Sequence, residues 1–436
     1  MAHDVSTYVI VGTGAAGISA AQAIRQRDPA ALITLIGDDP HGFYSRPGLA
    51  YYLTGELAER QLFLRQAGPF VMLTGRVTGL DVAGRRVITA DGREHHYDRL
   101  LLATGSAAGR LPTAGAELKG VVKLDNLEDA REIVRRAGRG RTAVVVGGGI
   151  TALEIVEALA ARGVSTNYLL RSDRYWPNVL DETESRLVEQ RLRNAGVRIH
   201  YRTQLACIFG KHGRVAAVET DRGERIKCHL VAGAIGVEPR LELARLAGLK
   251  IERAIATDEY LQTSAPDVYA AGDAVQESDD ITHKPTLDTL WSKALRQGRI
   301  AGANMAGDRE QYRRRVPFNV TRLAGLTTTI IGRVNAGPDD DLVSIARGDS
   351  ETWRQLPEVM AVQWHSRLDR TRVLVARNTI IGAVVMGDQT LSRPLQQLIA
   401  NRVDVTSIAE RLRRAGDALS DAIIGRWLEW SHGTAE

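Results

Sequence analysis

Two stretches of the chain show the same order of apolar and small residues. In the first, the apolar run 7–11 (TYVIV) is followed by a glycine-rich turn, a helical pattern over 15–27 and a second apolar run over 32–36. Continuous β-branched runs of this length are typical of parallel strands that are buried on both faces. The pattern therefore predicts a strand–helix–strand unit with parallel strands.

The second stretch repeats this order further along the chain. An apolar run over 142–146 (TAVVV) precedes three glycines, a helical pattern over 150–161 and another apolar run over 166–170. Each glycine turn lies between a strand and a helix, which is the arrangement of dinucleotide-binding folds. We therefore predict an α/β chain with two Rossmann-like units.

The rest of the pattern fills in these units and adds a third. Residues 76–98 predict hairpin strands, with turns at 83–84 and 91–92, and further apolar strands are expected at 100–105, 230–236 and 268–273. Beyond residue 313, strand-like runs are followed by amphipathic helices, which predicts a C-terminal α+β domain. The strand-like runs are 327–331, 360–364, 373–376 and 380–385. The basic run at 313–315 is interpreted as a solvated linker, with partner docking as the alternative.

Composition removes several classes of protein. The chain has 436 residues, 44% of them hydrophobic and 25% charged, as in globular proteins with a core. A net charge of +5 argues against a nucleic-acid binder. Two cysteines exclude a disulfide scaffold and an all-cysteine cluster. We see no leader peptide at the N-terminus and no apolar run of about 18 residues, so we expect no membrane span and a cytoplasmic location.

The first glycine turn carries the GxGxxG pattern. Gly12 makes the tight turn, Gly14 and the following Ala15 let a pyrophosphate approach the helix N-terminus, and Gly17 allows close helix–strand packing. An acid about 20 residues later is expected at the ribose hydroxyls, and Asp38 is the candidate. A glycine turn without a ligand is the alternative.

The second glycine turn carries GxGxxA, with Gly147, Gly149 and Ala152. Its second strand is followed by Arg171 where an acid would favour a free 2′-hydroxyl, and an arginine suits a 2′-phosphate. The pattern therefore favours NADPH over NADH. In a chain so rich in arginine, an ordinary exposed arginine after a strand is the alternative.

Several further segments resemble one family. They are 103–105 (ATG), 270–273 (AAGD), 290–307 (LWSKALRQGRIAGANMAG) and 37–57 (GDDPHGFYSRPGLAYYLTGEL), which holds an RPxL core. Together with the two glycine turns, they resemble the FAD-dependent pyridine nucleotide-disulfide oxidoreductase superfamily over about residues 5–310. Within it, the chain is similar to the branch without a redox cysteine, that of ferredoxin and rubredoxin reductases and the flavin portion of NAD(P)H nitrite reductases.

The resemblance implies an order of domains. The FAD-binding domain spans 1–112 and 243–312, the NAD(P)-binding domain is inserted at 113–242, and 313–436 form a C-terminal α+β interface domain. It also implies a homodimer formed through that last domain.

The resemblance implies the positions of both cofactors as well. Toward FAD it places Gly12, Gly14, Ala15, Gly17, Asp38, Arg46, the backbone of Val77, Thr104, Gly105, Asp273 at the ribityl chain and Trp291 at the flavin pyrimidine. Toward NAD(P)H it places Gly147, Gly149, Ala152, Glu154 near the nicotinamide, Arg171 and Gly236. A plain core or interface tryptophan is the alternative for Trp291, and a solvated helix charge is the alternative for Glu154. Tyr51 stands where ferredoxin-reductase relatives often carry a lysine near the flavin, so it is a possible flavin or nicotinamide neighbour.

The chemistry is then that of the flavin, with a hydride passing from NAD(P)H to flavin N5. No nucleophile or metal site is expected; His95 and His96 are interpreted as a solvated strand edge, and Cys207 and Cys228 as core residues. Electrons then leave for a separate carrier, which is a ferredoxin, a rubredoxin or a nitrite-reductase-type partner. The alternatives are an NAD(P)H oxidase or a disulfide or peroxide reductase, and a redox-sensing flavoprotein acting by interaction, like apoptosis-inducing factor.

Overall fold

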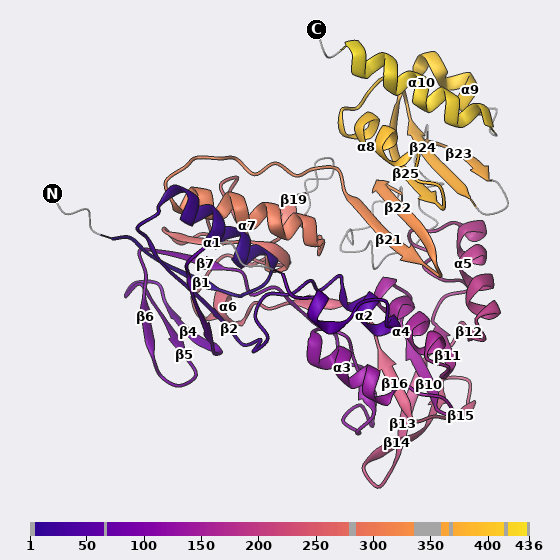
Figure 1. Ribbon diagram of the computed structural model, residues 1–436, viewed down its shortest axis with the longest axis horizontal. Coiled ribbons are helices and arrows are strands. Elements are labelled where there is room, and N and C mark those ends of the chain that lie inside the picture. The colour runs from indigo at the N-terminus through magenta and orange to yellow at the C-terminus, as the bar shows by residue number, and fades with distance from the viewer. Residues whose placement is uncertain are drawn as a thin grey trace.

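The chain forms three units around three five-stranded sheets (Figure 1). The computed structural model describes residues 5–64, 68–278, 285–334, 359–365, 369–413 and 417–433. Among these residues, no helix is both long enough and apolar enough to cross a bilayer.

The first unit is a parallel sheet with strand order β18-β7-β1-β2-β3. Alternate residues of its strands point to opposite faces: Ile10 and Leu101 pack under helices α1 and α7, while Val9 and Leu100 pack toward a small antiparallel sheet, β4-β5-β6. The strands are β1 (Thr7–Val11), β2 (Leu32–Gly37), β3 (Val71–Thr74), β4 (Val77–Asp81), β5 (Arg86–Thr89), β6 (Glu94–His96), β7 (Arg99–Leu102) and β18 (Val268–Ala270). The helices are α1 (Ala15–Arg27) and α7 (Trp291–Met305), with the short elements α6 (Glu242–Leu246), η2 (Gly272–Ala274), β19 (Glu277–Ser278) and β20 (Pro285–Thr286). The short helices α2 (Leu49–Thr54) and η1 (Glu59–Gln61) follow β2 in the chain, but Leu49 and Leu53 of α2 pack into the core of the second unit.

Helices α1 and α7 touch through their backbones. A Cβ atom at Gly298 would lie 2.1 Å from the Ala16 carbonyl oxygen, and one at Gly302 would lie 2.4 Å from that of Ala20. Only glycine fits at such distances, so these two glycines let the second half of α7 pack directly on the first half of α1.

The second unit is a parallel sheet with order β12-β11-β10-β16-β9. Helices α3 and α4 share a core with one face, and the antiparallel sheet β13-β14-β15 covers the other. The strands are β9 (Val121–Val122), β10 (Thr142–Val146), β11 (Ser165–Leu170), β12 (Arg198–Tyr201), β13 (Leu205–Lys211), β14 (Arg214–Thr220), β15 (Arg225–Lys227) and β16 (Leu230–Gly233); the helices are α3 (Leu127–Arg136), α4 (Ile150–Ala161) and α5 (Glu182–Asn194).

The chain passes between these two units at a pair of short antiparallel strands, β8 (Ser106–Ala108) and β17 (Val237–Pro239). The division at 1–112, 113–242 and 243–312 stays a prediction.

The third unit is an antiparallel sheet with order β21-β22-β25-β24-β23. The apolar face of this sheet packs against α8 and α10. Its elements are β21 (Phe318–Leu323), β22 (Leu326–Gly332), β23 (Val359–His365), β24 (Arg370–Ala376), β25 (Thr379–Met386), α8 (Ser392–Ala400), η4 (Thr406–Ile408), α9 (Ala409–Arg413) and α10 (Asp417–Gly433).

The periodicity predicted most elements but overran three strands. The strands predicted at 100–105, 230–236 and 268–273 end at Leu102, Gly233 and Ala270. In each case a glycine with positive φ follows within a few residues, and it turns the chain out of the sheet. These turns matter because they put the strand ends at the cavity described below.

The solvated-linker interpretation of 313–315 is wrong for Arg314. The Arg314 Nε atom lies 3.2 Å from Glu277 Oε2, and the two side chains are 11% and 4% exposed. This buried ion pair fastens the segment before the third unit to the first unit.

Candidate functional site

A cavity of about 1080 Å³ lies where the first two units meet. Its wall includes the N-termini of α1, α4 and α7 and the carboxyl ends of β2, β7, β11 and β16. Ligands of open α/β sheets bind outside the carboxyl ends of the strands. The volume lies at the upper end of the roughly 300–1,000 Å³ of small-ligand sites, so the cavity is large enough for an extended ligand.

The first glycine turn leaves the start of α1 open to the cavity. Gly12 has φ of 121°, and a Cβ there would lie 2.0 Å from the Ala103 carbonyl oxygen. Gly14 is the N-cap of α1, where no side chain caps the helix and the first turn carries no acid. A Cβ at Gly14 would meet nothing within 4 Å. Amide groups of this kind, without a protein acceptor, suit a pyrophosphate.

The second glycine turn has the same construction at α4. Gly147 has φ of 144°, and its Cβ would lie 2.1 Å from the Ala234 carbonyl oxygen. Gly149 is the N-cap, again without a side-chain cap or an acid in the first turn. At Gly148, a Cβ would meet nothing within 4 Å. A second pyrophosphate therefore fits here, so the residues present suit two dinucleotides in one cavity.

The third small residue of each fingerprint lies behind the wall. A Cβ at Gly17 would lie 2.0 Å from the Gly12 carbonyl oxygen, and Ala152 is fully buried with its Cβ 3.1 Å from the Cβ position of Gly147. Neither residue lines the cavity. They let helix and turn approach each other, which is the packing role predicted for this position.

The residues after β2 and β11 differ in charge, as predicted. Asp38 is exposed at the cavity edge, and its neighbour Asp39 accepts hydrogen bonds from the Tyr44 hydroxyl (2.8 Å) and the His41 amide (3.1 Å). Arg171 is exposed in the lining, and it makes no ion pair or side-chain hydrogen bond within the described part of the chain. The cavity thus has an acidic residue after β2 and an arginine after β11.

The predicted flavin-side residues gather around the ends of β7 and β18. The Ser106 hydroxyl donates to Asp273 Oδ2 (2.7 Å), and the Thr104 hydroxyl donates to the Arg240 carbonyl oxygen (2.8 Å). Trp291 begins α7 in the cavity wall, and its ring stacks on Phe43 with centroids 5.8 Å apart. Gly105 and Gly236 line the same region.

Glu154 lies half-buried in the cavity wall on the first turns of α4, so it is not a solvated helix charge. Burial raises the pKa of its carboxyl to about 8, with a smaller contribution from the neighbouring Glu157 carboxylate and an opposing one from Arg322. The pKa of Glu157 is also raised, mainly by burial. A carboxyl group of this kind keeps its proton at neutral pH and can donate a hydrogen bond.

Two predicted neighbours lie elsewhere. Tyr51 does not line the cavity: helix α2 turns Leu49 and Ala50 toward it, while the Tyr51 ring is 39% exposed under the Arg322 guanidinium, 5.0 Å from its centroid. The expectation that Tyr51 contacts the flavin or nicotinamide is therefore not supported. Val77 packs its side chain into the core outside the cavity lining, and the role of its backbone stays a prediction.

Several charged or polar lining residues were not predicted as site residues, among them Asp39, Asp125, Arg240 and Asn319. Asp39 had a local signal, because it directly follows Asp38, and so did Arg240, which follows a proline just after the predicted strand 230–236. Asp125 and Asn319 come from a loop and a strand that the tertiary fold brings to the cavity.

Neither cysteine reaches the cavity. Cys228 is buried under the second sheet, and burial raises the pKa of its thiol to about 12; Cys207 is half-buried on β13. Both are unpaired. Within the described ranges, no group of three or more His, Cys, Asp or Glu side chains is arranged to hold a metal ion.

Comparison with known proteins gives a consistent result. Residues 6–298 match the family model of pyridine nucleotide-disulphide oxidoreductases. The chain is 33% identical over 308 residues to the rubredoxin-NAD(+) reductase of Pseudomonas putida, covering 69% of this chain and 80% of that protein. It is 32% identical over 354 residues to the ferredoxin–NAD(+) reductase component of the biphenyl dioxygenase system of Paraburkholderia xenovorans, covering 80% and 85%.

A solved structure agrees over nearly the whole length. The covalent complex of putidaredoxin reductase with putidaredoxin superposes with a TM-score of 0.84 at 25% identity, covering 97% of this chain and 99% of that one.

Proposed function

The chain belongs to the pyridine nucleotide-disulphide oxidoreductase family, and we propose that within it the protein is an FAD-dependent NAD(P)H reductase that passes electrons to a separate carrier protein. It is an oxidoreductase, and its cofactors are FAD and NAD(H). The observation that carries the proposal is one cavity shared by the two glycine turns, at Gly12–Gly14 and Gly147–Gly149, each of which leads into a helix without a side-chain cap.

FAD, when bound, supplies the two-electron chemistry toward the nicotinamide and the one-electron chemistry toward the carrier. The chain binds and orients it. Gly12, Gly14 and Ala15 hold its pyrophosphate, Asp38 its ribose, and Asp273 its ribityl hydroxyls.

The glycine turn before α4 orients the nicotinamide dinucleotide. Gly147 and Gly149 hold the pyrophosphate, and Gly236 lines the nicotinamide end of the wall. Protonated Glu154 donates a hydrogen bond there, which suits a carboxamide oxygen. Holding both rings in one enclosed space supplies proximity and excludes water, which are the protein's main contributions to a hydride transfer.

The carrier is proposed from the cysteines and the relatives. Because neither cysteine lines the cavity, a thiol relay to a disulfide or peroxide is disfavoured. Two of the relatives are named for rubredoxin and ferredoxin. We therefore propose a small iron–sulfur or rubredoxin-type protein as the electron acceptor. We also propose that the protein is cytoplasmic and forms a homodimer through residues 313–436.

We further propose a preference for NADPH, which rests on Arg171. Its guanidinium lies free of ion pairs among the described residues at the end of β11, where a 2′-phosphate would sit. Arg171→Glu should reverse the ratio of kcat/KM for NADPH and NADH, because it replaces an attraction by a repulsion. Arg214→Glu is the control: it makes the same charge change at an exposed residue, the first of β14, outside the cavity lining. An unchanged ratio in Arg171→Glu would refute the preference.

Turnover with different acceptors tests the function. The FAD-loaded protein is supplied with NADH or NADPH and with rubredoxin, a [2Fe–2S] ferredoxin or oxygen alone. We expect a carrier to accelerate nucleotide oxidation by about tenfold or more over oxygen. Equal rates with and without carriers, with oxygen consumed in step, would identify an oxidase instead.

A further inference from the structure

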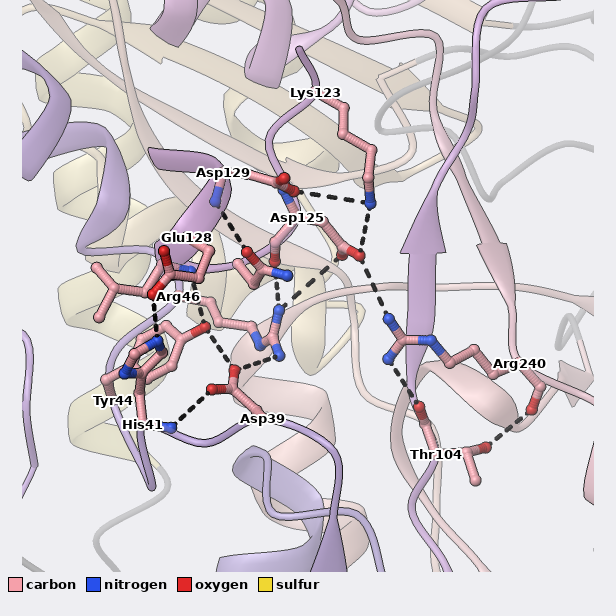
Figure 2. A network of polar contacts seen from close by, with 12 residues as sticks. Asp39, His41, Tyr44, Arg46, Thr104, Lys123, Asp125, Glu128, Asp129 and Arg240 are labelled. Atoms are coloured by element: carbon pink, nitrogen blue, oxygen red, sulfur yellow. Dashed lines mark hydrogen bonds and ion pairs between the residues drawn. The ribbon is translucent and has the colours of Figure 1, made fainter. Parts of the chain in front are cut away.

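A chain of charged side chains crosses the junction between the first two units beside the cavity (Figure 2). It alternates in sign, with three carboxylates and three cations. Its members are Asp39, Arg46, Asp125, Arg240, Lys123 and Asp129.

Asp125 lies at the centre of this chain. It follows β9 in the second unit, and its side chain is only 10% exposed. One carboxylate oxygen lies 3.2 Å from Lys123 Nζ and 3.3 Å from Arg240 Nη2, and the other lies 4.0 Å from Arg46 Nη1. The same Arg46 nitrogen donates to the Asp125 carbonyl oxygen. Asp125 is thus held by one cation of its own unit, one of the first unit and one of the strand that connects them.

Each of the two arginines leads on to a wall of the cavity. Arg46 pairs with Asp39 at 3.5 Å, next to the ribose candidate Asp38. Arg240 donates to the Thr104 carbonyl oxygen (3.4 Å), and its own backbone amide donates to the Gly105 carbonyl oxygen (2.9 Å). Both paths start on the carboxylate of Asp125 and end at residues that line the proposed FAD site.

The junction has a second carboxylate, that of Glu128, which contacts neither Arg46 nor Arg240. Glu128 pairs with His41 (2.6 Å) and Arg131 (2.6 Å), is 58% exposed and does not line the cavity. Its ion pair with His41 also joins the two units. A variant of Glu128 therefore shows what is lost when a contact across the junction is removed without disturbing Arg46 or Arg240.

We propose that Asp125 is a positioning residue for hydride transfer, which orients Arg46 and Arg240 and thereby holds the nicotinamide-binding unit in register with the FAD wall. The proposal rests on the proposed function. Without the Asp125 charge, Arg46 keeps Asp39 and Lys123 keeps Asp129, but Arg240 loses its ion pair. Arg240 directly follows strand β17, which connects the two units. When Arg240 loses its ion pair with Asp125, the connection between the units should become more mobile, while the interior of each unit stays as it is.

The test compares Asp125→Asn with Glu128→Gln in the full-length, FAD-loaded protein. In Asp125→Asn, the limiting rate of flavin reduction by NAD(P)H should fall by about tenfold or more, since small misplacements of reacting groups are costly. The variant should retain its FAD. The NAD(P)H concentration that gives half of the limiting rate should stay within about threefold of the wild-type value. Glu128→Gln should behave as wild type.

A second readout does not depend on activity. The Arg240 amide and the Gly109 amide, which donates to the Gly236 carbonyl oxygen (2.8 Å), close the β8–β17 pair. Their hydrogen exchange should accelerate in Asp125→Asn and not in Glu128→Gln. Asp125→Glu, which keeps the charge, should recover part of the rate.

A double-mutant cycle decides whether Asp125 acts through Arg240. If it does, Asp125→Asn together with Arg240→Gln costs no more than the larger single change. Additive losses, or an Asp125→Asn protein with wild-type rate and exchange, would overturn the proposal. If the wild-type flavin is not reduced by NADH or NADPH at all, the proposed function fails instead; the exchange experiment then still reports on the junction.

Discussion

Replacing Glu154 by glutamine removes an ionisable group from the cavity wall while keeping its size and polarity. The pKa of this carboxyl is raised to about 8 from an ordinary value of 4.5, chiefly by burial and then by Glu157. Since a tenfold change in proton affinity corresponds to 1.36 kcal/mol, ionised Glu154 in the folded protein is disfavoured by roughly 4–5 kcal/mol.

The sign of the pH effect follows from the direction of the pKa shift. The folded state keeps the Glu154 proton between about pH 4.5 and pH 8, whereas the unfolded chain has lost it. The stability that this proton contributes is fully present below pH 4.5, declines as pH rises and is gone above about pH 8. Glu154→Gln does not titrate, so its stability relative to wild type should increase over this window and level off above it.

Denaturant unfolding of the wild type and Glu154→Gln between about pH 5 and pH 9 measures the difference. Glu182→Gln, at a side chain 77% exposed, is the control for a lost carboxylate without burial. A pH-independent difference between wild type and Glu154→Gln would refute the assignment. The same titration should appear in flavin reduction: the wild-type rate should change near pH 8, and that step should be absent in Glu154→Gln.

Three further predictions concern other parts of the molecule. Gly12→Ala should abolish FAD retention, because the φ of Gly12 is 121° and a Cβ there would lie 2.0 Å from a carbonyl oxygen. Bound flavin is measured after gel filtration, and retained flavin would contradict the role of this glycine turn in holding FAD. Cys207→Ser with Cys228→Ala should keep flavin reduction by NAD(P)H within about twofold, because neither thiol lines the cavity; a dead but folded and flavin-loaded variant would restore a thiol mechanism. Glu184→Gln should lower the free energy of unfolding by roughly 1.5–3 kcal/mol, because it removes the nearer of two carboxylates from buried Arg372, at 2.9 Å, and leaves Asp181 at 3.7 Å. An unchanged denaturation midpoint would show that Asp181 alone is sufficient for Arg372.

Hydrophobic periodicity was sufficient to predict the strands and helices of the first two units, because their central strands are buried on both faces and read as continuous apolar runs. The glycines between strand and helix could also be recognised, because the tight turns leave no room for a side chain. The helix predicted at 15–27 begins where Gly14 caps it, and the one at 150–161 begins where Gly149 does. Short strands such as β8 and β17 were not predicted, since a pair of three-residue strands carries no period. They form only because the chain crosses twice at one place.

The site residues likewise fall into those that the sequence could indicate and those that only the tertiary structure brings together. The glycine motifs, Asp38 and Arg171 could be named from local pattern, and the family resemblance added Thr104, Gly105 and Asp273. Most of these residues line the cavity. Asp125 could not, because its three cations come from residues 46, 123 and 240, which no motif relates. Tyr51 was misplaced for the converse reason: its motif position was right, but the contact with Arg322 of β21 is tertiary.

Anaerobic stopped-flow reduction tests the central claim most directly. The purified protein, reconstituted with FAD, is mixed with NADH or NADPH while the flavin absorbance is followed, and oxidised rubredoxin or ferredoxin is then added. We expect a nicotinamide nucleotide to bleach the flavin rapidly, and the flavin absorbance to return as the carrier is reduced. A bound flavin that neither NADH nor NADPH bleaches would contradict it.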